Sequence, residues 1–172
     1  RMFDIASQLT YDNRPDFVRR EHESFSGFRG IHGRVFARHI MDLTFGQGFD
    51  GVGTKPEVAE RLNDHLGTAY DLFAMAVDDA PVRGAEVISI GSILDVRQVY
   101  SDDPQVAKNI ESGMRQLAQG MVGAAKDAGV VVINGEIAEL GARIQGYGDF
   151  NYNWGAGVFW AAHEDRLLTG RE

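Results

Sequence analysis

The sequence predicts a mixed α/β (α+β) fold, with a sheet of about four strands and helices on one face. Runs of β-branched and aromatic residues alternate along the chain with segments that repeat apolar residues every three or four positions. The helical segments also carry start and stop signals, such as Asp103-Pro104 and Gly129. The segments follow in the order strand, two helices, strand, long helix, strand, strand, which is typical of a layered α/β domain.

Composition bounds the possible functions. The 172 residues are 44% hydrophobic and 24% charged, as expected of one globular domain. The net charge of −8 argues against nucleic acid or an anionic membrane surface as a partner, but it allows a phosphorylated ligand that is bound through Mg²⁺. The absence of cysteine excludes disulfides and thiolate nucleophiles. No apolar run is long enough for a membrane span or a secretory signal, so a cytoplasmic protein is expected.

The first part of the chain is predicted to be an arm followed by the main domain. Residues 1–30 are polar, charged and weakly periodic, so an N-terminal arm or loop is expected there. The domain then covers 31–172. Its first strand is predicted near 35–45, where β-branched and aromatic residues partly alternate with polar ones.

A helix is predicted at 56–66. Thr54 and Glu57 fit a capping box, and Pro56 falls in the first turn, where its missing N–H costs nothing. The expected apolar stripe of this helix is Val58, Leu62 and Leu66.

A buried helix is expected at 68–79, which is apolar nearly all round, and a strand at 86–97. Asp103, as N-cap, then opens a long helix that ends at Gly129. The apolar stripe of the long helix is predicted to be Val106, Ile110, Met114 (or Gly113), Leu117, Met121 and Ala125 (or Ala124).

Two strands are expected in the last part of the chain. "VVVI" at 130–133 predicts a buried strand that runs into "NGEIAEL". "NYNWGAGVFWAAHE" predicts a last strand rich in aromatic residues. These rings suit core or interface packing better than stacking on a nucleobase, because Tyr152 and Trp154 alternate with asparagines.

The stretch "FGQGFDGVGTKPEVAERL" (45–62) is the first candidate site. It is not a P-loop, because glycine, threonine and lysine stand in the wrong order. Gly51 and Gly53 would let the backbone approach a ligand, and Thr54 begins a helix whose N-terminus offers N–H groups. Lys55 could neutralise a phosphate and Asp50 could hold a metal ion. The structural alternative is an ordinary tight turn before a helix.

Further acids extend this candidate site. Asp71 lies in an otherwise apolar helix, with the Asp78-Asp79 pair two turns later, and Glu136 follows the strand "VVVIN". A buried carboxylate is costly unless it is paired or binds a cation. Asp50, Asp79 and Glu136, at the ends of separate elements, would make a Mg²⁺ cluster. The alternatives are a salt bridge or capping contact for Asp71, and a solvated helix end for the aspartate pair.

Six segments together resemble the amino-terminal half of a known enzyme family, in their order and spacing. They are "DGVGTK" (50–55), "YDLFAMAVDD" (70–79), "RGAE" (83–86), "LD" (94–95), "GEIAE" (135–139) and "LLTGR" (167–171). The family is aminoimidazole ribonucleotide synthetase, also called phosphoribosylformylglycinamidine cyclo-ligase. The resemblance covers roughly residues 25–172.

The resemblance implies a Mg²⁺-ATP site and a purine-biosynthesis reaction, the conversion of formylglycinamidine ribonucleotide to aminoimidazole ribonucleotide. It implies ATP or phosphate contacts by Gly51, Gly53, Thr54, Lys55, Asp71 and Asn134, and Mg²⁺ ligation by Asp50, Asp79 and Glu136. A glycine-rich segment, here "GFRGIHG" (27–33), would fold over the phosphates. The resemblance also implies a homodimer, in which the sheet completes a barrel with a second subunit. The partners would then be a nucleotide and a phosphorylated small molecule.

The chain departs from the family pattern at a few places. Asp78 replaces an asparagine, Asn134 a glycine and Ile137 a threonine, and the family's carboxy-terminal domain has no counterpart before Glu172. We therefore expect either an amino-terminal domain or a half-length relative. Two other functions stay open: another ATP-dependent phosphotransferase of the same superfamily, or a non-catalytic dimerisation module that retains the fold.

Overall fold

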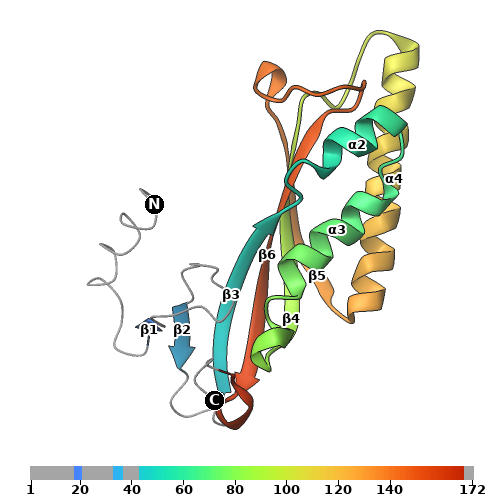
Figure 1. Ribbon diagram of the computed structural model, residues 1–172. Helices are drawn as coiled ribbons and strands as arrows, with labels where there is room; N and C mark the ends of the chain where they lie inside the picture. Colours follow the sequence, from blue (N-terminus) through green and yellow to red (C-terminus); the bar gives the residue numbers. More distant parts are fainter. Residues whose placement is uncertain (1–17, 21–32, 37–42, 169–172) are drawn as a thin grey trace. The chain divides into compact units, whose positions relative to one another are not determined.

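A computed structural model describes residues 18–20, 33–36 and 43–168 of the chain (Figure 1). The predicted arm over 1–30 and the glycine-rich segment at 27–33 lie almost wholly outside these residues. The chain divides into two compact units. The larger one holds Phe49–Asp78 and Ser89–Val158, and the smaller one holds the described parts of Arg1–Gly48, Asp79–Ile88 and Phe159–Glu172.

The strands form one mixed sheet in the order β1-β2-β3-β6-β4-β5. Four of them are long: β3 (Leu43–Gly51), β4 (Glu86–Val96), β5 (Val131–Glu139) and β6 (Tyr152–His163). The other two, β1 (Val18–Arg20) and β2 (Gly33–Phe36), are short and antiparallel. The predicted α/β class is confirmed, and the expected four strands correspond to the long ones.

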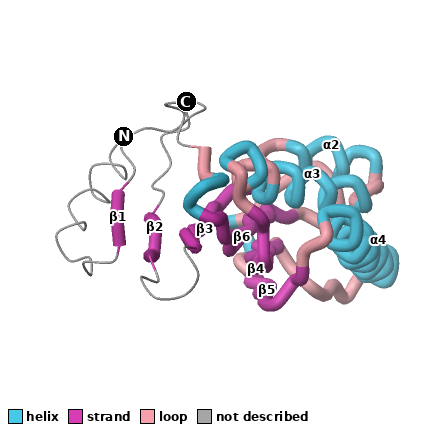
Figure 2. Tube along the Cα trace, turned by 90° about the horizontal axis from the view of Figure 1, so that it is seen from below, coloured by secondary structure: helices cyan, strands magenta, loops and turns pink. Residues whose placement is uncertain are grey.

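β4 and β5 pair in parallel, from Ser89 opposite Val131 to Val96 opposite Glu139, with a bulge after Ile90. Parallel neighbours need a crossover, and the long helix between these strands supplies it. That helix is α4 (Pro104–Ala128). Figure 2 shows α4, α3 (Leu66–Val77) and α2 (Lys55–Leu62) on the same side of the strands in the larger unit.

The ends of α4 were predicted correctly. The Asp103 carboxylate accepts hydrogen bonds from the N–H groups of Gln105 (2.8 Å) and Val106 (3.2 Å), and Gly129 ends the helix with φ 66°. The buried stripe consists of Ile110, Gly113, Leu117, Gly120 and Ala124. Of the two open choices, the structure buries Gly113 rather than Met114 and Ala124 rather than Ala125. The predicted members Val106 and Met121 are only half-buried, and Gly120 takes the place of Met121. Small residues bring α4 close to its neighbours.

α2 differs from the prediction in three ways. It ends at Leu62 rather than residue 66, because Asn63 takes a left-handed conformation with φ 51°. The capping box is absent, since Thr54 makes no side-chain capping hydrogen bond. The predicted stripe is on the solvent side, with Val58, Leu62 and Leu66 60%, 70% and 42% exposed. The buried side is instead formed by Pro56, Ala59 and Glu60.

α3 is a helix as predicted, but it is not buried all round. Leu66, Tyr70 and Ala74 are exposed along one side. The opposite side is buried and packs on α4, with Thr68, Ala69, Leu72, Phe73, Ala76 and Val77 as its members. The hydrophobicity of the exposed side misled the prediction.

β5 was predicted as a buried strand, and this was wrong. It is the outermost strand after β4, and Val131, Ile133 and Ile137 are all exposed. It also runs on to Glu139, so Asn134 and Glu136 lie inside a strand rather than just after one. An edge strand has a neighbour on one side only, and periodicity alone does not reveal this.

β6 is the aromatic strand that the sequence predicted. In the larger unit, Tyr152, Trp154, Ala156 and Val158 alternate with less buried residues, as one covered face of a strand does. The predicted strand near 35–45 corresponds to parts of β2 and β3, with 37–42 outside the described residues. No described helix is long and apolar enough to cross a membrane.

Candidate nucleotide site

The turn between β3 and α2 holds five of the predicted site residues. β3 ends at Gly51, and the buried Val52 donates its N–H to the Trp154 carbonyl at 3.0 Å. A Cβ at position 51 would lie 3.3 Å from that carbonyl, so Gly51 serves the packing of β3 on β6. Gly53 has φ +61° and open space around it, which fits a turn that a ligand can approach.

Backbone hydrogen bonds use part of the donor capacity at the start of α2. Lys55 N–H donates to the Val52 carbonyl (3.3 Å) and Glu57 N–H to the Thr54 carbonyl (3.1 Å), while Pro56 has no N–H. In this turn, the N–H groups of Gly53 and Thr54 have no hydrogen-bond partner among the described residues. The turn therefore offers fewer free N–H groups to a ligand than the sequence suggested.

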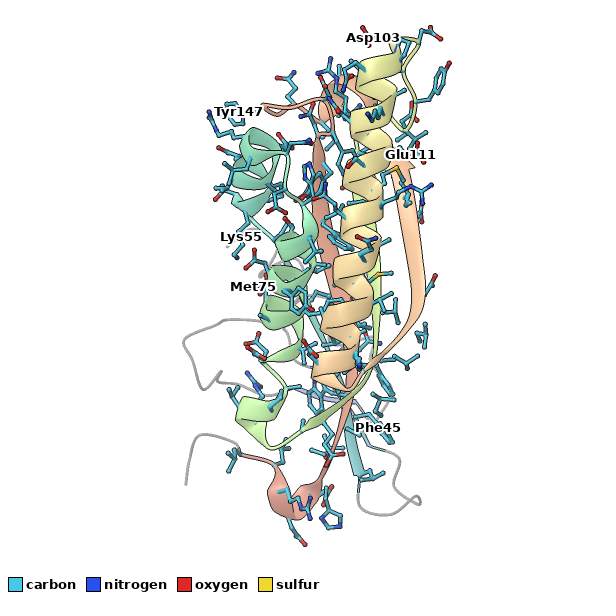
Figure 3. The ribbon with its side chains drawn as sticks, turned by 90° about the vertical axis from the view of Figure 1, so that its right-hand side faces the viewer. Phe45, Lys55, Met75, Asp103, Glu111 and Tyr147 are labelled. Carbon is cyan, nitrogen blue, oxygen red and sulfur yellow. The ribbon has the colours of Figure 1, made fainter. Side chains whose placement is uncertain are left out.

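The side chains of this turn carry opposite charges. Asp50 is half-buried, and one of its carboxylate oxygens accepts the N–H of Gly51 at 2.7 Å. Lys55 is half-buried at the start of α2 and has no ion pair within the described part of the chain (Figure 3). A lysine ammonium that no carboxylate neutralises can bind an anion.

Asp71 is half-buried on α3, in the larger unit. Its charge and that of Glu60 both help to raise the pKa of Tyr152, although burial of the phenol is the larger cause. A hydrogen bond with Thr68 opposes these effects. The resulting pKa of Tyr152 is about 12. Asp71 forms no ion pair with another described residue.

Asp79 belongs to the smaller unit. It is half-buried after the end of α3, whereas Asp78 is exposed. Burial lowers the pKa of Arg83, and the charge of Asp79 opposes this shift. The Asp79 carboxylate thus lies close enough to stabilise the charge of the buried Arg83, and it is not fully solvated.

Asn134 and Glu136 are exposed on β5, opposite Gly91 and Ile93 of β4. Asn134 accepts the N–H of Gly135 with its side-chain oxygen at 2.8 Å. Both residues line a cavity of about 430 Å³ in the larger unit, together with Ser92, Leu94, Leu117, Ala118, Met121, Val132, Ile133, Gly135, Ile137 and Trp154.

The proposed metal ligands do not form one preformed cluster. β6 and β4 separate β3 from β5, so the backbones of Asp50 and Glu136 lie three strand spacings apart, roughly 14 Å. No three acidic or histidine side chains come together as a metal site within the described residues. Mg²⁺ commonly takes one or two carboxylates and completes its shell with phosphate oxygens and water. Asp50, next to an open turn and a lysine, fits that kind of site.

Sequence reasoning missed a buried polar group beside the turn. Glu60 is only 7% exposed, and its carboxylate accepts hydrogen bonds from Tyr147 N–H (2.7 Å), the Asn151 side-chain amide (3.1 Å) and Tyr152 N–H (3.3 Å). His65 is also buried, with Nδ1 3.3 Å from the Tyr152 hydroxyl. Nothing in the spacing of "AERL" indicates that Glu60 faces inward.

The sequence of the chain is similar to those of known proteins. Residues 40–157 match the family described as AIR synthase related protein, N-terminal domain. A phosphoribosylformylglycinamidine cyclo-ligase of Pyrococcus horikoshii is 36% identical over 123 residues, 72% of this chain and 32% of that protein. One of Methanobrevibacter smithii is 33% identical over 133 residues, 77% of this chain and 35% of that protein. The chain thus spans about a third of these relatives.

Two solved structures share the fold. The thiamine-monophosphate kinase of Stenotrophomonas maltophilia has a TM-score of 0.55 at 11% identity, covering 97% of this chain and 42% of that chain. Phosphoribosylformylglycinamidine synthase II of Thermotoga maritima also has 0.55, at 14% identity, covering 79% and 20%. The family match and the cyclo-ligase relatives confirm the predicted resemblance in sequence, and the two structures confirm the fold. The chain belongs to the family of AIR synthase related proteins, and its residues 40–157 correspond to their N-terminal domain.

Proposed function

We propose that this chain is the Mg²⁺-ATP-binding part of a cyclo-ligase that converts formylglycinamidine ribonucleotide to aminoimidazole ribonucleotide in the cytoplasm. The observation that carries the proposal is the turn from Asp50 to Lys55. It joins a half-buried carboxylate, an open positive-φ glycine and a lysine that has no ion pair with any described residue, in a chain at least 30% identical to enzymes named for this reaction.

Each group of the turn has a distinct role in this proposal. The Lys55 ammonium and the N–H groups of Gly53 and Thr54 bind phosphate oxygens. Asp50 would hold Mg²⁺, which would neutralise phosphate charge. When bound, Mg²⁺-ATP supplies the phosphoryl group that activates the substrate amide oxygen for displacement by an amine nitrogen. The residues of the turn act by positioning and charge neutralisation, which is the main protein contribution to phosphoryl transfer.

The remaining predicted ligands are assigned to the same nucleotide. Asp71 and Asn134 are proposed to contact the nucleotide, and Asp79 and Glu136 to hold Mg²⁺. Because β6 and β4 lie between the strands of Asp50 and Glu136, we propose that the two carboxylates act on different ions or on different parts of the bound ligand. The Glu136 side chain is exposed and has no hydrogen-bond partner among the described residues. Its carboxylate is therefore free to bind a cation.

We further propose that the active form is a homodimer whose two sheets close one barrel. In the larger unit, the sheet carries exposed apolar residues on β3 and β4: Phe49 is 78% exposed, and Ile93 is also exposed. Covering such residues with a second copy would bury apolar surface and protect sheet edges. In this proposal, residues from outside this chain contribute to the substrate site.

One alternative has specific support. The fold is shared with a thiamine-monophosphate kinase over nearly the whole chain, and "NGEIAE" differs from the cyclo-ligase pattern at Asn134 and Ile137. An ATP-dependent phosphotransferase with another substrate would keep the same nucleotide turn. Turnover of a panel of phosphate acceptors by the longest natural form of the protein distinguishes the two functions. A non-catalytic dimerisation module would keep the dimer and lose the nucleotide.

The deciding experiment is calorimetric titration of the purified chain with a non-hydrolysable ATP analogue, with and without Mg²⁺. We expect binding that depends on Mg²⁺, because the turn pairs an anion-binding lysine with a single carboxylate. A folded chain that binds no nucleotide under saturating Mg²⁺ would contradict the proposal and favour the dimerisation module.

A further inference from the structure

Glu60 is the most deeply buried acid in the larger unit, and its environment is built around it. Taking a carboxylate out of water is costly unless hydrogen-bond donors replace the lost solvent. Here the three donors come from one short segment, the loop from Tyr147 to Tyr152 that leads into β6. The last turn of α2 is therefore attached to the start of β6.

The loop approaches Glu60 more closely than a side chain would allow. A Cβ at Gly146 would overlap the Glu60 carboxylate, and one at Gly148 would lie 3.0 Å from the Glu60 carbonyl. On the outside of the same attachment, the Arg61 guanidinium lies 3.5 Å from the centre of the Tyr147 ring. Figure 3 shows Tyr147 in the loop beside the end of α2.

The other end of the nucleotide turn is attached to the same strand. Val52 N–H donates to the Trp154 carbonyl at 3.0 Å, and Gly51 packs on that carbonyl. Tyr152 and Trp154 are two residues apart in β6. The turn from Asp50 to Lys55 is thus bounded by two attachments to β6, one before it through Val52 and one after it through Glu60.

We propose that Glu60 is a positioning residue for nucleotide binding. It fixes the orientation of α2, and with it the directions of the Lys55 side chain and of the Gly53 and Thr54 N–H groups. A helix of two turns that is held at its last turn has little freedom at its first. This inference rests on the proposed function, since it assumes that the turn binds phosphate. Its physical basis is preorganisation, which improves affinity by reducing the ordering that binding requires.

Two variants test the proposal from opposite directions. Glu60→Gln keeps the side-chain size and removes the charge, whereas Gly146→Ala keeps the charge and displaces the carboxylate. Ile110→Ala, in the fully buried part of α4, is the control for a general loss of stability. We expect Glu60→Gln and Gly146→Ala each to raise the Kd for a Mg²⁺-bound ATP analogue about tenfold or more. Ile110→Ala should leave the Kd unchanged at a comparable loss in Tm.

The sign of the Glu60→Gln effect separates positioning from electrostatics. Removing a negative charge near a site for phosphate would by itself tighten binding. Weaker binding therefore indicates a loss of positioning, and unchanged or tighter binding would overturn the proposal.

Hydrogen exchange of the backbone amides at 52–57 gives a readout that needs no nucleotide. Exchange should be faster in Glu60→Gln and in Gly146→Ala than in Ile110→Ala. Unchanged exchange would also overturn the inference. If exchange accelerates and the unaltered chain binds no nucleotide, then the proposed function fails while the mechanical role of Glu60 stands.

Discussion

Gly120 of α4 lies directly against the backbone carbonyl of Leu66 in α3, so closely that a Cβ at position 120 would overlap the carbonyl oxygen. The Ala69 methyl group would lie only 2.9 Å from such a Cβ. This contact sets the distance between the two helices. It is also why the buried stripe of α4 contains glycine where a larger apolar residue would otherwise be expected.

We predict that Gly120→Ala destabilises the protein, although alanine is the better helix former. Forcing the helices apart should cost about 1–3 kcal/mol of unfolding free energy. Urea unfolding followed by circular dichroism measures it. The matched control is Gly67→Ala in α3, where nothing lies within 4 Å of an added Cβ. That change should stabilise the protein by about 0.4–1 kcal/mol. Equal effects of the two substitutions would contradict the close contact between Gly120 and Leu66.

A second prediction concerns the nucleotide turn. Lys55→Ala and Asp50→Asn should each abolish binding of the ATP analogue without unfolding the chain, because both side chains project from a turn that buried Val52 anchors. Calorimetry and a thermal melt of the same samples give the two quantities. A collapse in Tm would show instead that these residues hold the fold. Lys126→Ala, exposed near the end of α4, serves as the control for loss of one positive charge.

A third prediction follows from the exposed side of α2. Leu62→Ser should change the unfolding free energy by no more than about 0.5 kcal/mol, because the side chain is already in water. Ala59→Leu, one turn earlier on the buried side, should destabilise by about 1–3 kcal/mol through overpacking. If Leu62→Ser lowered the unfolding free energy more than Ala59→Leu, the apolar stripe predicted from the sequence would be supported instead.

The fourth prediction is a pH dependence of stability that comes from His65. Burial lowers the pKa of His65 below its ordinary value of 6.5, and the charge of Asp64 only partly opposes this. The unfolded chain therefore binds the proton more readily than the folded one. Stability should be full above about pH 6.5 and should fall as the pH drops below that value towards the folded pKa.

Tm measured from pH 8 to pH 5 checks this dependence. Replacing the imidazole by an amide in His65→Gln should flatten the profile over that range, whatever its cost at neutral pH. His163, which is exposed, provides the control variant His163→Gln with an unaltered slope. A slope that survives in His65→Gln would assign it to other groups.

Helices and strands were predicted well where residues close together in the sequence decide the structure. Asp103 and Gly129 fixed both ends of α4, because capping depends on side chains within a few positions. The alternation around Tyr152 and Trp154 likewise identified β6. These signals are local, and the structure confirms them.

The errors arose where tertiary contacts decide. Leu62 looks like a core residue from its spacing, yet Glu60 is the one buried, because a distant loop supplies its hydrogen bonds. "VVVI" reads as buried, yet β5 has a neighbour on one side only. The same limit applies to the site. The turn at Asp50–Lys55 is contiguous and can be found from sequence, whereas the separation of Asp50 from Glu136 depends on strand order.

The position of β6 in the sheet has a consequence for biosynthesis. β6 lies between β3 and β4, although it follows both of them, and β5, in the chain. Until residues 152–163 have emerged, β3 has no partner on that side and β4 can pair only with β5. Forming the sheet therefore requires contacts between residues far apart in the chain, which slow folding. A nascent chain halted before Tyr152 would leave one edge of β3 and one edge of β4 unpaired, and unpaired strand edges promote association with other chains.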